Sequence, residues 1–281
     1  MNQEILRRLH EAAAFVTNKG YRPVYIALFG SQNYGLDVHN EEYQSDFDYK
    51  CIVLPTLADL VKNANPASVV LDYEGGHIDV KDIREYMKTL RRANPAYIEP
   101  LITQYALSLN EGEKYMPQIR SKVVDLVSQE GYVFTNACKG LFYEKRNKMT
   151  HPYPTKIDLI AKYGYDGKQV CHMLRMLLML KAFVATGRCK LEPPQEYIRQ
   201  LIDLKLNLYT LDEAVAMANG WIVELEHVSE VLETIYKKAD LDFEAAEQMN
   251  AYAQQIVFDF CQTELGKGTL NKGETNESLS Q

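Results

Sequence analysis

The sequence predicts an α+β fold, in which a small mixed-sheet domain is followed by an α-helical domain. Strand-like apolar runs bounded by Gly and Pro occur before about residue 111, and helical periods dominate after it. The 281 residues are 46% hydrophobic and 25% charged, as in ordinary globular proteins, and a chain of this length buries a sizeable core without disulfides or a structural metal. We therefore predict one domain at residues 1–112 and a helical domain at residues 113–265.

The first domain alternates helices and strands. An apolar stripe predicts a helix up to about residue 19, formed by Ile5, Leu9, Ala12 and Val16. The next run, Arg22–Gly30, is apolar on both faces, which is typical of a buried central strand. After a polar loop come a strand in DFDYKCIVLP, a short helix in TLADLVKN, and a hairpin of SVVLDY and HIDV joined by two glycines. Helices follow in DIREYMKTLRRA and after Asn94 and Pro95, which form an N-cap and first-turn pair.

The second domain is predicted to be helical throughout. Its candidate helices are Glu113–Gln129, Tyr132–Lys148, Gly167–Thr186, Pro194–Leu204, Leu211–Lys238 and Phe243–Leu265. Thr210 and Glu213 form a capping box before the fifth of them. The polar and Gly-rich residues 266–281 are predicted to be a disordered tail.

The charge of the chain is unevenly distributed. The net charge of −7 argues against bulk, non-specific binding to a polyanion. Residues 139–190 nevertheless hold eleven Lys or Arg against three Asp or Glu, a local balance of +8, which leaves −15 for the rest. Such a segment indicates a local phosphate-binding surface. The alternative is a solvated basic face, which composition alone favours.

Neither a membrane protein nor a disulfide-stabilised protein is expected. The N-terminal segment is charged and amphipathic, without the apolar core of a signal peptide. The most apolar stretch, VCHMLRMLLMLKAFV, is interrupted by His172, Arg175 and Lys181, so it is not predicted to span a membrane. The five cysteines include no CxxC pair, which argues against a zinc site or a disulfide framework. We predict a cytoplasmic protein.

Two aspartates, Asp46 and Asp48, stand two residues apart at the start of a predicted strand. Because strand side chains alternate between faces, both are expected to point the same way, and carboxylates this close repel unless a cation lies between them. Asp79, in HIDV, joins the same patch if the two strands pair. Asp82 is the alternative third acid, but it is suited to cap the next helix. Three carboxylates on strands suit Mg²⁺, and two such ions about 4 Å apart activate a hydroxyl and stabilise a leaving pyrophosphate.

A Gly-Ser pair precedes these carboxylates. Gly30 and Ser31 leave the predicted strand directly, and such a turn offers backbone N–H groups and a hydroxyl to a phosphate. Fourteen residues separate Ser31 from Asp46. An Asp-x-Asp pair alone is common at strand ends for structural reasons, but the Gly-Ser turn before it and Asp79 after it favour a functional site.

The order of these motifs resembles the DNA polymerase β nucleotidyltransferase superfamily, whose signature is an apolar residue, Gly-Ser, a spacer and Asp-x-Asp. Five segments are more specifically similar to a family of bacterial and phage nucleotidyltransferases related to the polymerase-β-like proteins associated with RNA repair: LFGSQNYGLD, SDFDYKCIVLP, HIDVKDIR, EKRNKMTHPYP and YGYDGKQVCHMLR. The resemblance covers roughly residues 20 to 190. It implies a polymerase-β-like catalytic domain at residues 1–112 and nucleotidyl transfer with two Mg²⁺ ions, or Mn²⁺ in their place. It also implies that Asp46, Asp48 and Asp79 are the metal ligands.

Lys168, His172 and Arg175 are spaced i, i+4, i+7 on one predicted helix whose other positions are apolar. A cationic stripe on a buried helix is costly without anionic partners, so we expect it to face the carboxylates across a cleft and to hold a triphosphate. The alternative is a solvated helix face. For His172 alone, a hydrogen-bonded structural role is favoured over a metal-ligating one.

Other residues have weaker signals. Lys145 lies on the preceding predicted helix, and the family resemblance adds weight to it. Lys50 shares the face of Asp48 and either contacts a phosphate or neutralises the acids. Gly140, in the middle of a helix, costs about 1 kcal/mol relative to Ala and therefore indicates close approach of another element or a ligand. Glu99, together with Asn94 and Pro95, is interpreted as part of a helix start.

We therefore predict an enzyme that binds an NTP and Mg²⁺ in a cleft between the two domains and transfers NMP to an acceptor hydroxyl, with release of pyrophosphate. The hydroxyl is expected to lose its proton near Asp79. The expected nucleotide-binding residues are Gly30, Ser31, Lys50, Lys145, Lys168, His172 and Arg175. Three acceptors remain open, namely a short RNA 3′ end, a protein side chain and a small molecule. A catalytically silent nucleotide-binding module is the other class, and the three carboxylates argue against it.

Overall fold

The computed structural model describes residues 3–41 and 43–277, with side chains up to residue 266. A five-stranded mixed sheet forms its centre, in the order β3-β4-β2-β1-β5. β2 and β4 pair in parallel, whereas the other neighbours are antiparallel. The strands are β1 (Arg22–Phe29), β2 (Asp48–Leu54), β3 (Ser68–Tyr73), β4 (Gly76–Asp82) and β5 (Ala106–Ser108). The predicted mixed sheet followed by helices is confirmed.

The helices of the sheet region agree with the sequence pattern. They are α1 (Gln3–Asn18), α2 (Leu57–Val61), α3 (Ile83–Leu90) and α4 (Pro95–Ile102). The side chain of Asp82 accepts a hydrogen bond from the backbone N–H of Arg84 and so caps α3. Asn94 caps α4 in the same way, and Pro95 occupies its first turn. Strand β5, with only three residues, was too short to show a pattern in the sequence.

The remaining helices are α5 (Gly112–Ser121), α6 (Val123–Gln129), α7 (Gly131–Lys148), α8 (Ile157–Tyr163), α9 (Gly167–Thr186), α10 (Gln195–Lys205), α11 (Leu211–Ile235) and α12 (Glu244–Glu277). The single helix predicted over Glu113–Gln129 is wrong, because Lys122 (φ −88°, ψ −6°) separates α5 from α6. Helix α8 was not predicted. Residues 267–277 continue α12 as backbone, residues 278–281 lie outside the described part, and the disorder of the tail stays a prediction.

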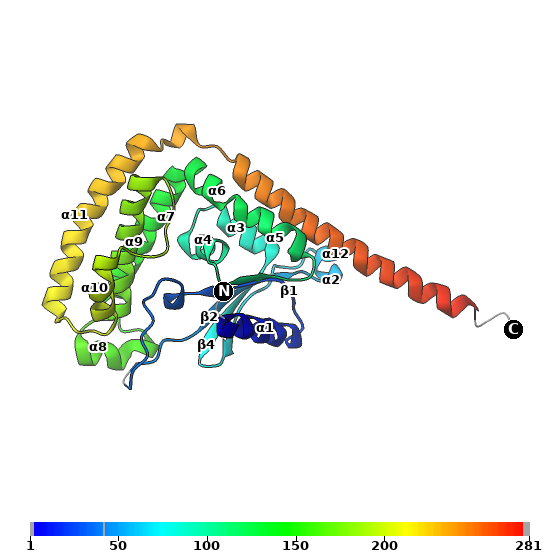
Figure 1. Ribbon diagram of the computed structural model, residues 1–281, viewed down its shortest axis with the longest axis horizontal. Coiled ribbons are helices and arrows are strands. Elements are labelled where there is room, and N and C mark those ends of the chain that lie inside the picture. The colour runs from blue at the N-terminus through cyan, green and yellow to red at the C-terminus, as the bar shows by residue number, and fades with distance from the viewer. Residues whose placement is uncertain (1–2, 42, 278–281) are drawn as a thin grey trace.

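Each face of the sheet is covered by helices, which gives the molecule its layers (Figure 1). The apolar stripe of α1 packs on one face, where Leu9, Ala12 and Val16 are fully buried against Ile26 and Val80. The core of the other face continues without a break from the sheet into α9 and on to α12. The sheet and the helices therefore share one core, and the domain boundary at residue 112 stays a prediction.

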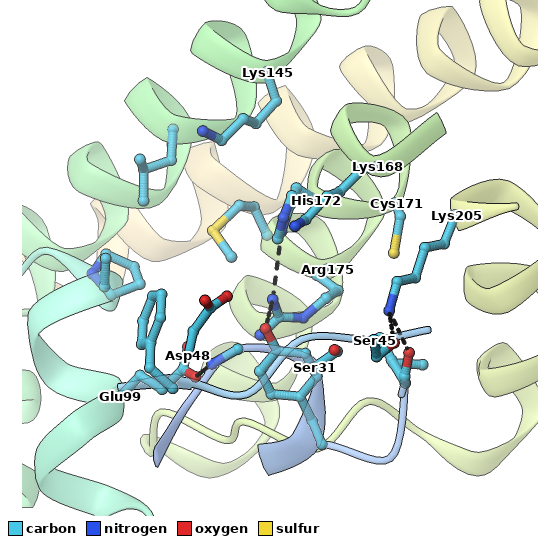
Figure 2. Close-up of a pocket in the computed structure, with 18 of the residues that line it drawn as sticks. Ser31, Ser45, Asp48, Glu99, Lys145, Lys168, Cys171, His172, Arg175 and Lys205 are labelled. Carbon is cyan, nitrogen blue, oxygen red and sulfur yellow. Dashed lines mark hydrogen bonds between the residues drawn. The ribbon is translucent and has the colours of Figure 1, made fainter. Parts of the chain in front are cut away.

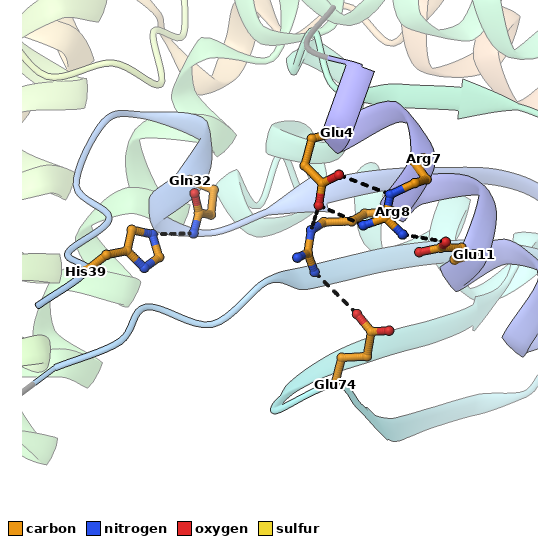
Figure 3. Close-up of polar contacts among 7 residues, drawn as sticks. All are labelled: Glu4, Arg7, Arg8, Glu11, Gln32, His39 and Glu74. Carbon is orange, nitrogen blue, oxygen red and sulfur yellow. Dashed lines mark hydrogen bonds and ion pairs between the residues drawn. The ribbon is translucent and has the colours of Figure 1, made fainter. Parts of the chain in front are cut away.

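Charged side chains tie α1 to the hairpin between β3 and β4. Arg7 and Arg8 both pair with Glu4, and Arg8 lies 3.3 Å from Glu74 in the hairpin turn (Figure 3). Exposed pairs of this kind contribute about 0–1 kcal/mol each. The position of α1 therefore depends mainly on its buried apolar stripe.

Helix α9 begins and ends at the predicted residues, and capping explains both ends. The side chain of Asp166 accepts from the backbone N–H of Lys168, and Gly187 takes the left-handed conformation that ends the helix. Among the described helices, α9 alone has the length and composition of a membrane span. However, 61% of its apolar window is buried inside the protein, as in a core helix. A cytoplasmic location stays a prediction.

Candidate active site

A cavity of about 260 Å³ lies between the end of β1 and helices α4, α7 and α9. Its lining includes most of the residues selected from the sequence: Gly30, Ser31, Asp46, Asp48, Lys145, Lys168, His172 and Arg175. The loop after β1 and the start of β2 form one wall, and the side chains of α7 and α9 form the other (Figure 2). The fold therefore brings together residues from both halves of the sequence.

The carboxylates of the first wall differ in their settings. Asp48 is the first residue of β2, and its Oδ1 accepts the backbone N–H of His77 at 3.0 Å. Asp46 lies two residues before the strand and is exposed, so the expectation that both residues belong to one strand is wrong. Both carboxylates nevertheless line the same cavity.

Asp79 has different partners. In the parallel register of β2 and β4 it lies opposite Lys50, whose Nζ is 2.6 Å from its Oδ2, and Nζ of Lys81 is 3.2 Å from its Oδ1. Lys50 is buried, with its ammonium 4.6 Å from the ring centre of Tyr97. Neither Asp79 nor Lys50 lines the cavity. Of the two interpretations of Lys50, the contacts thus favour neutralisation of an acid, and the role of Asp79 as a metal ligand stays a prediction.

The second wall carries the positive charges. Lys168, His172 and Arg175 all reach the cavity from α9, and Lys145 reaches it from α7 (Figure 2). Lys168 is exposed, whereas Arg175 is only 6% exposed. The stripe therefore faces the aspartates across the cavity rather than forming a fully solvated face, which agrees with the arrangement expected from the sequence.

Arg175 is held by buried contacts, and the half-buried His172 lies beside it, with Nδ1 at 3.5 Å from Nη1 of Arg175. Nη1 of Arg175 donates to the hydroxyl of Tyr34 at 2.7 Å, and its guanidinium carbon lies 3.4 Å from the centre of that ring. Nε of Arg175 is buried without a hydrogen-bond partner among the described residues. Burial and the neighbouring cations, of which Arg175 and Lys168 act most strongly, lower the pKa of His172 well below 6.5. The imidazole is therefore neutral near pH 7.

Sequence reasoning missed Lys205. This residue ends α10 and lines the cavity, yet it is only 7% exposed. Its Nζ donates to the carbonyl oxygen of Leu36 and to Oγ of Ser45, both at 2.9 Å. Burial lowers the pKa of Lys205, as does the nearby charge of Lys168. Lysine is common in the last turn of helices, so the sequence contained no signal that Lys205 lies at the cavity.

Glu99 is the other missed residue. It was interpreted as part of a helix start, but it lines the cavity with its side chain and is 5% exposed. Its Oε1 accepts the backbone N–H of Gly30 at 2.7 Å and the amide of Asn33 at 3.0 Å. Burial raises the pKa of Glu99, and Arg175 acts against this shift. The N–H of Gly30, expected to bind phosphate, is thus already bonded to the protein.

The expectation that another element of the protein approaches Gly140 closely is wrong, whereas approach of a ligand stays a prediction. A Cβ atom built on this residue meets nothing within 4 Å, so no element approaches it closely. Gly140 is exposed, and the helix tolerates it as an unfavourable residue on a solvent-facing surface.

The cavity offers two carboxylates, a set of ligands that suits Mg²⁺. Mg²⁺ is usually held by one or two carboxylates together with substrate phosphates and waters, and Asp46 and Asp48 supply such oxygens in one cavity. In the part of the chain that the structure describes, no three His, Cys, Asp or Glu side chains form a preformed metal cluster. Lys50 engages Oδ2 of Asp79, so a second ion would share this carboxylate with the ammonium group.

The chain matches the sequence model of a known family. The sequence model of the family described as RlaP, RNA repair pathway DNA polymerase beta family, matches residues 1–252. No curated protein matches the chain.

Proposed function

Because the chain belongs to the RNA repair pathway DNA polymerase beta family, we propose that it is a Mg²⁺-dependent nucleotidyltransferase that transfers NMP from an NTP to the 3′-hydroxyl of an RNA end. One observation carries this proposal: a single cavity has the Gly30–Ser31 turn, Asp46 and Asp48 on one wall and Lys145, Lys168 and Arg175 on the other. A magnesium-bound triphosphate needs this combination of oxygen ligands and cations.

The side chains of the two walls have separate tasks. Asp46 and Asp48 would hold Mg²⁺, which when bound polarises the phosphate and stabilises the leaving pyrophosphate. Ser31 offers its hydroxyl to the β- and γ-phosphates. Lys168 and Arg175 offset the negative charge that grows on the leaving group.

The reaction forms a bond between the acceptor oxygen and the α-phosphorus. The bond between the α-phosphorus and its bridging oxygen breaks, pyrophosphate leaves, and the proton of the hydroxyl passes to water. The protein contributes mainly by positioning and by electrostatic stabilisation, as is general for enzymes of phosphate transfer.

One observation supports RNA as the acceptor, and a second favours a short end over a long strand. The family description names an RNA repair pathway. In addition, much of the basic segment is paired with acids, as in Lys139 with Glu226 and Lys181 with Glu224. A surface neutralised in this way suits contact with a short end better than a long electrostatic track.

The experiment that tests the acceptor uses α-³²P-labelled NTPs, one at a time, with Mg²⁺ and separate RNA, protein and metabolite fractions. We expect label in RNA alone, and no label with Asp48→Asn. Label in protein or in a small molecule would replace the RNA proposal by one of these acceptors. No label in any fraction, with intact binding of NTP, would indicate a silent nucleotide-binding module.

A further inference from the structure

Glu99 is a buried carboxylate in contact with the turn that leaves β1. It stands on α4, whose start is fixed by the Asn94 cap, and a single oxygen, Oε1, accepts both the N–H of Gly30 and the amide of Asn33. Transfer of a carboxylate from water into a protein is costly unless it gains hydrogen bonds. A glutamate at this position therefore needs a reason beyond the formation of α4.

The turn that Glu99 contacts begins at a glycine whose backbone conformation other residues avoid. Gly30 has φ 90° and ψ −158°, a combination that essentially only glycine adopts. Asn33 holds the other side of the turn, because its backbone N–H donates to the carbonyl oxygen of Gly30 at 2.9 Å and its amide donates to that of Leu28 at 2.8 Å. Because a glycine also has many other backbone conformations open to it, the hydrogen bonds of Glu99 and Asn33 restrict the turn to this one.

The position of this turn matters for the cavity. A Cβ atom built on Gly30 would lie 3.8 Å from Oδ2 of Asp48, so the turn and the carboxylate are neighbours. Ser31, the next residue, is the polar side chain of the turn that lines the cavity. A shift of Gly30 therefore changes the distance between the Ser31 hydroxyl and Asp48.

We propose that Glu99 is a positioning residue of the triphosphate site: by holding the N–H of Gly30, it fixes Ser31 relative to Asp48. This proposal rests on the proposed nucleotide-binding function. Glu99 acts in this proposal through the N–H of Gly30 and not as a group that binds the phosphates. Its task needs a hydrogen-bond acceptor at Oε1 but no negative charge.

Two substitutions separate positioning from charge. Glu99→Gln keeps an acceptor oxygen and removes the charge, whereas Glu99→Ala removes both. If the charge were what mattered, both variants would bind an anion more tightly, because a nearby negative charge is gone. Positioning predicts instead that Glu99→Ala binds more weakly and that Glu99→Gln binds at least as tightly as the original protein.

The first measurement is calorimetric titration with Mg²⁺–tripolyphosphate, which probes the phosphate site without a base, and with Mg²⁺–ATP. We expect the dissociation constant for tripolyphosphate to rise tenfold or more in Glu99→Ala and to stay within threefold, or to fall, in Glu99→Gln. The proposal is overturned if Glu99→Ala has the same dissociation constant as the original protein. It is also overturned if both variants lose affinity equally. Thermal melting shows whether each variant folds, and Glu99→Met, of similar volume and without an acceptor, replaces Glu99→Ala if the latter does not.

The second measurement needs no ligand. Amide hydrogen exchange of residues 29–34 is expected to be at least tenfold faster in Glu99→Ala and unchanged in Glu99→Gln. Unchanged exchange in Glu99→Ala overturns the positioning role, whether or not the original protein binds tripolyphosphate or ATP. Failure of the original protein to bind either ligand would instead refute the proposed function. The matched control is Glu130→Gln, since Glu130 is also a buried glutamate but lies outside the cavity lining. The Glu130→Gln substitution should change neither the dissociation constants nor the exchange of residues 29–34.

Discussion

Lys168, His172 and Arg175 follow one another on α9, but the protein holds each of them differently. Lys168 is exposed at the cavity, His172 is kept neutral by burial and by its cationic neighbours, and Arg175 is buried against Tyr34. Substitution of each residue therefore has a different consequence. Removal of Arg175 disturbs the fold as well as the site, so Lys168 and His172 are better probes of nucleotide binding.

Lys168→Ala is expected to weaken binding of Mg²⁺–ATP by about 1.5–3 kcal/mol, the range for a hydrogen bond to a charged group. Stability should change by less than about 0.5 kcal/mol, because the side chain is exposed. Calorimetric titration and denaturant melts measure the two quantities. Lys190→Ala is the control, because Lys190 is an exposed lysine of the same basic segment outside the cavity lining. Equal affinities in both variants would remove Lys168 from the nucleotide site.

The neutral state of His172 predicts a pH dependence. Its pKa in the free protein lies below 6.5, and a bound triphosphate raises it, so binding is coupled to uptake of a proton. Affinity for Mg²⁺–ATP should therefore increase as the pH falls from 8 to 6, more steeply than in His172→Gln. Comparison at each pH cancels the protonation of ATP itself. Parallel curves for the two proteins would contradict the assignment.

The same pKa predicts an effect on folding. Because the folded state resists protonation of His172, the unfolded state binds more protons, and stability falls as the pH decreases below about 6.5. His172→Gln should lose less stability than the original protein between pH 7 and pH 5, as denaturant melts at the two pH values would show. An equal loss in both proteins would be evidence against a neutral imidazole in the folded state.

At the scale of elements, the sequence predicted those features that local interactions determine, such as the ends of a helix. The ends of α9 follow from the Asp166 cap and the Gly187 stop, which are visible in the sequence. The break at Lys122 and the short strand β5 have no such signal, because tertiary packing decides them. The pairing of Asp79 with Lys50 likewise depends on the register of β2 and β4, which only the folded sheet defines.

The residues of the candidate site also fall into two groups, those that the sequence could predict and those that it could not. Gly30–Ser31 and Asp48 could be predicted because their order and spacing lie within one strand–loop–strand unit. Lys205 and Glu99 could not, because each reaches the cavity only through the docking of its helix, α10 or α4, on a distant segment. A lone lysine or glutamate in a helix has many ordinary explanations.

Two glycines test how helices α7 and α9 are placed. A Cβ atom on Gly167 would lie 2.0 Å from the carbonyl oxygen of Leu204, whereas one on Gly140 meets nothing within 4 Å. Gly167→Ala should therefore destabilise the protein by about 1–3 kcal/mol, and Gly140→Ala should stabilise it by about 0.5–1 kcal/mol. Denaturant melts of the two variants measure both effects. The same sign of change in both would contradict the packing described.

At the scale of the whole molecule, the cavity exists because two halves of the chain share a core. Helix α12 also returns to the sheet region, where Glu264 pairs with Arg22 and the ring of Phe260 lies under its guanidinium. These contacts join α12 to β1, the strand that ends at the carboxylate wall of the cavity. A magnesium-bound triphosphate would bridge the two walls.

If the triphosphate and its metal bridge the two walls, ATP and Mg²⁺ should stabilise the folded protein more in combination than separately. The melting temperature should rise more with ATP plus Mg²⁺ than the sum of the rises with either alone, since both bind one site of the folded state. Differential scanning calorimetry measures this, and Asp48→Asn should lose the synergy while it keeps its fold. Purely additive shifts would argue against a metal-bridged triphosphate.

The central claim, transfer of NMP from an NTP to an RNA end in this cavity, is tested most directly by labelling the two ends of the nucleotide. RNA with a free 3′-hydroxyl is incubated with the protein, Mg²⁺ and either α-³²P- or γ-³²P-NTP. We expect α-label in the RNA and γ-label in released pyrophosphate, with both signals lost in Asp48→Asn and when the RNA ends in a 3′-phosphate. Undiminished transfer by Asp48→Asn, or γ-label in the RNA, would contradict the account.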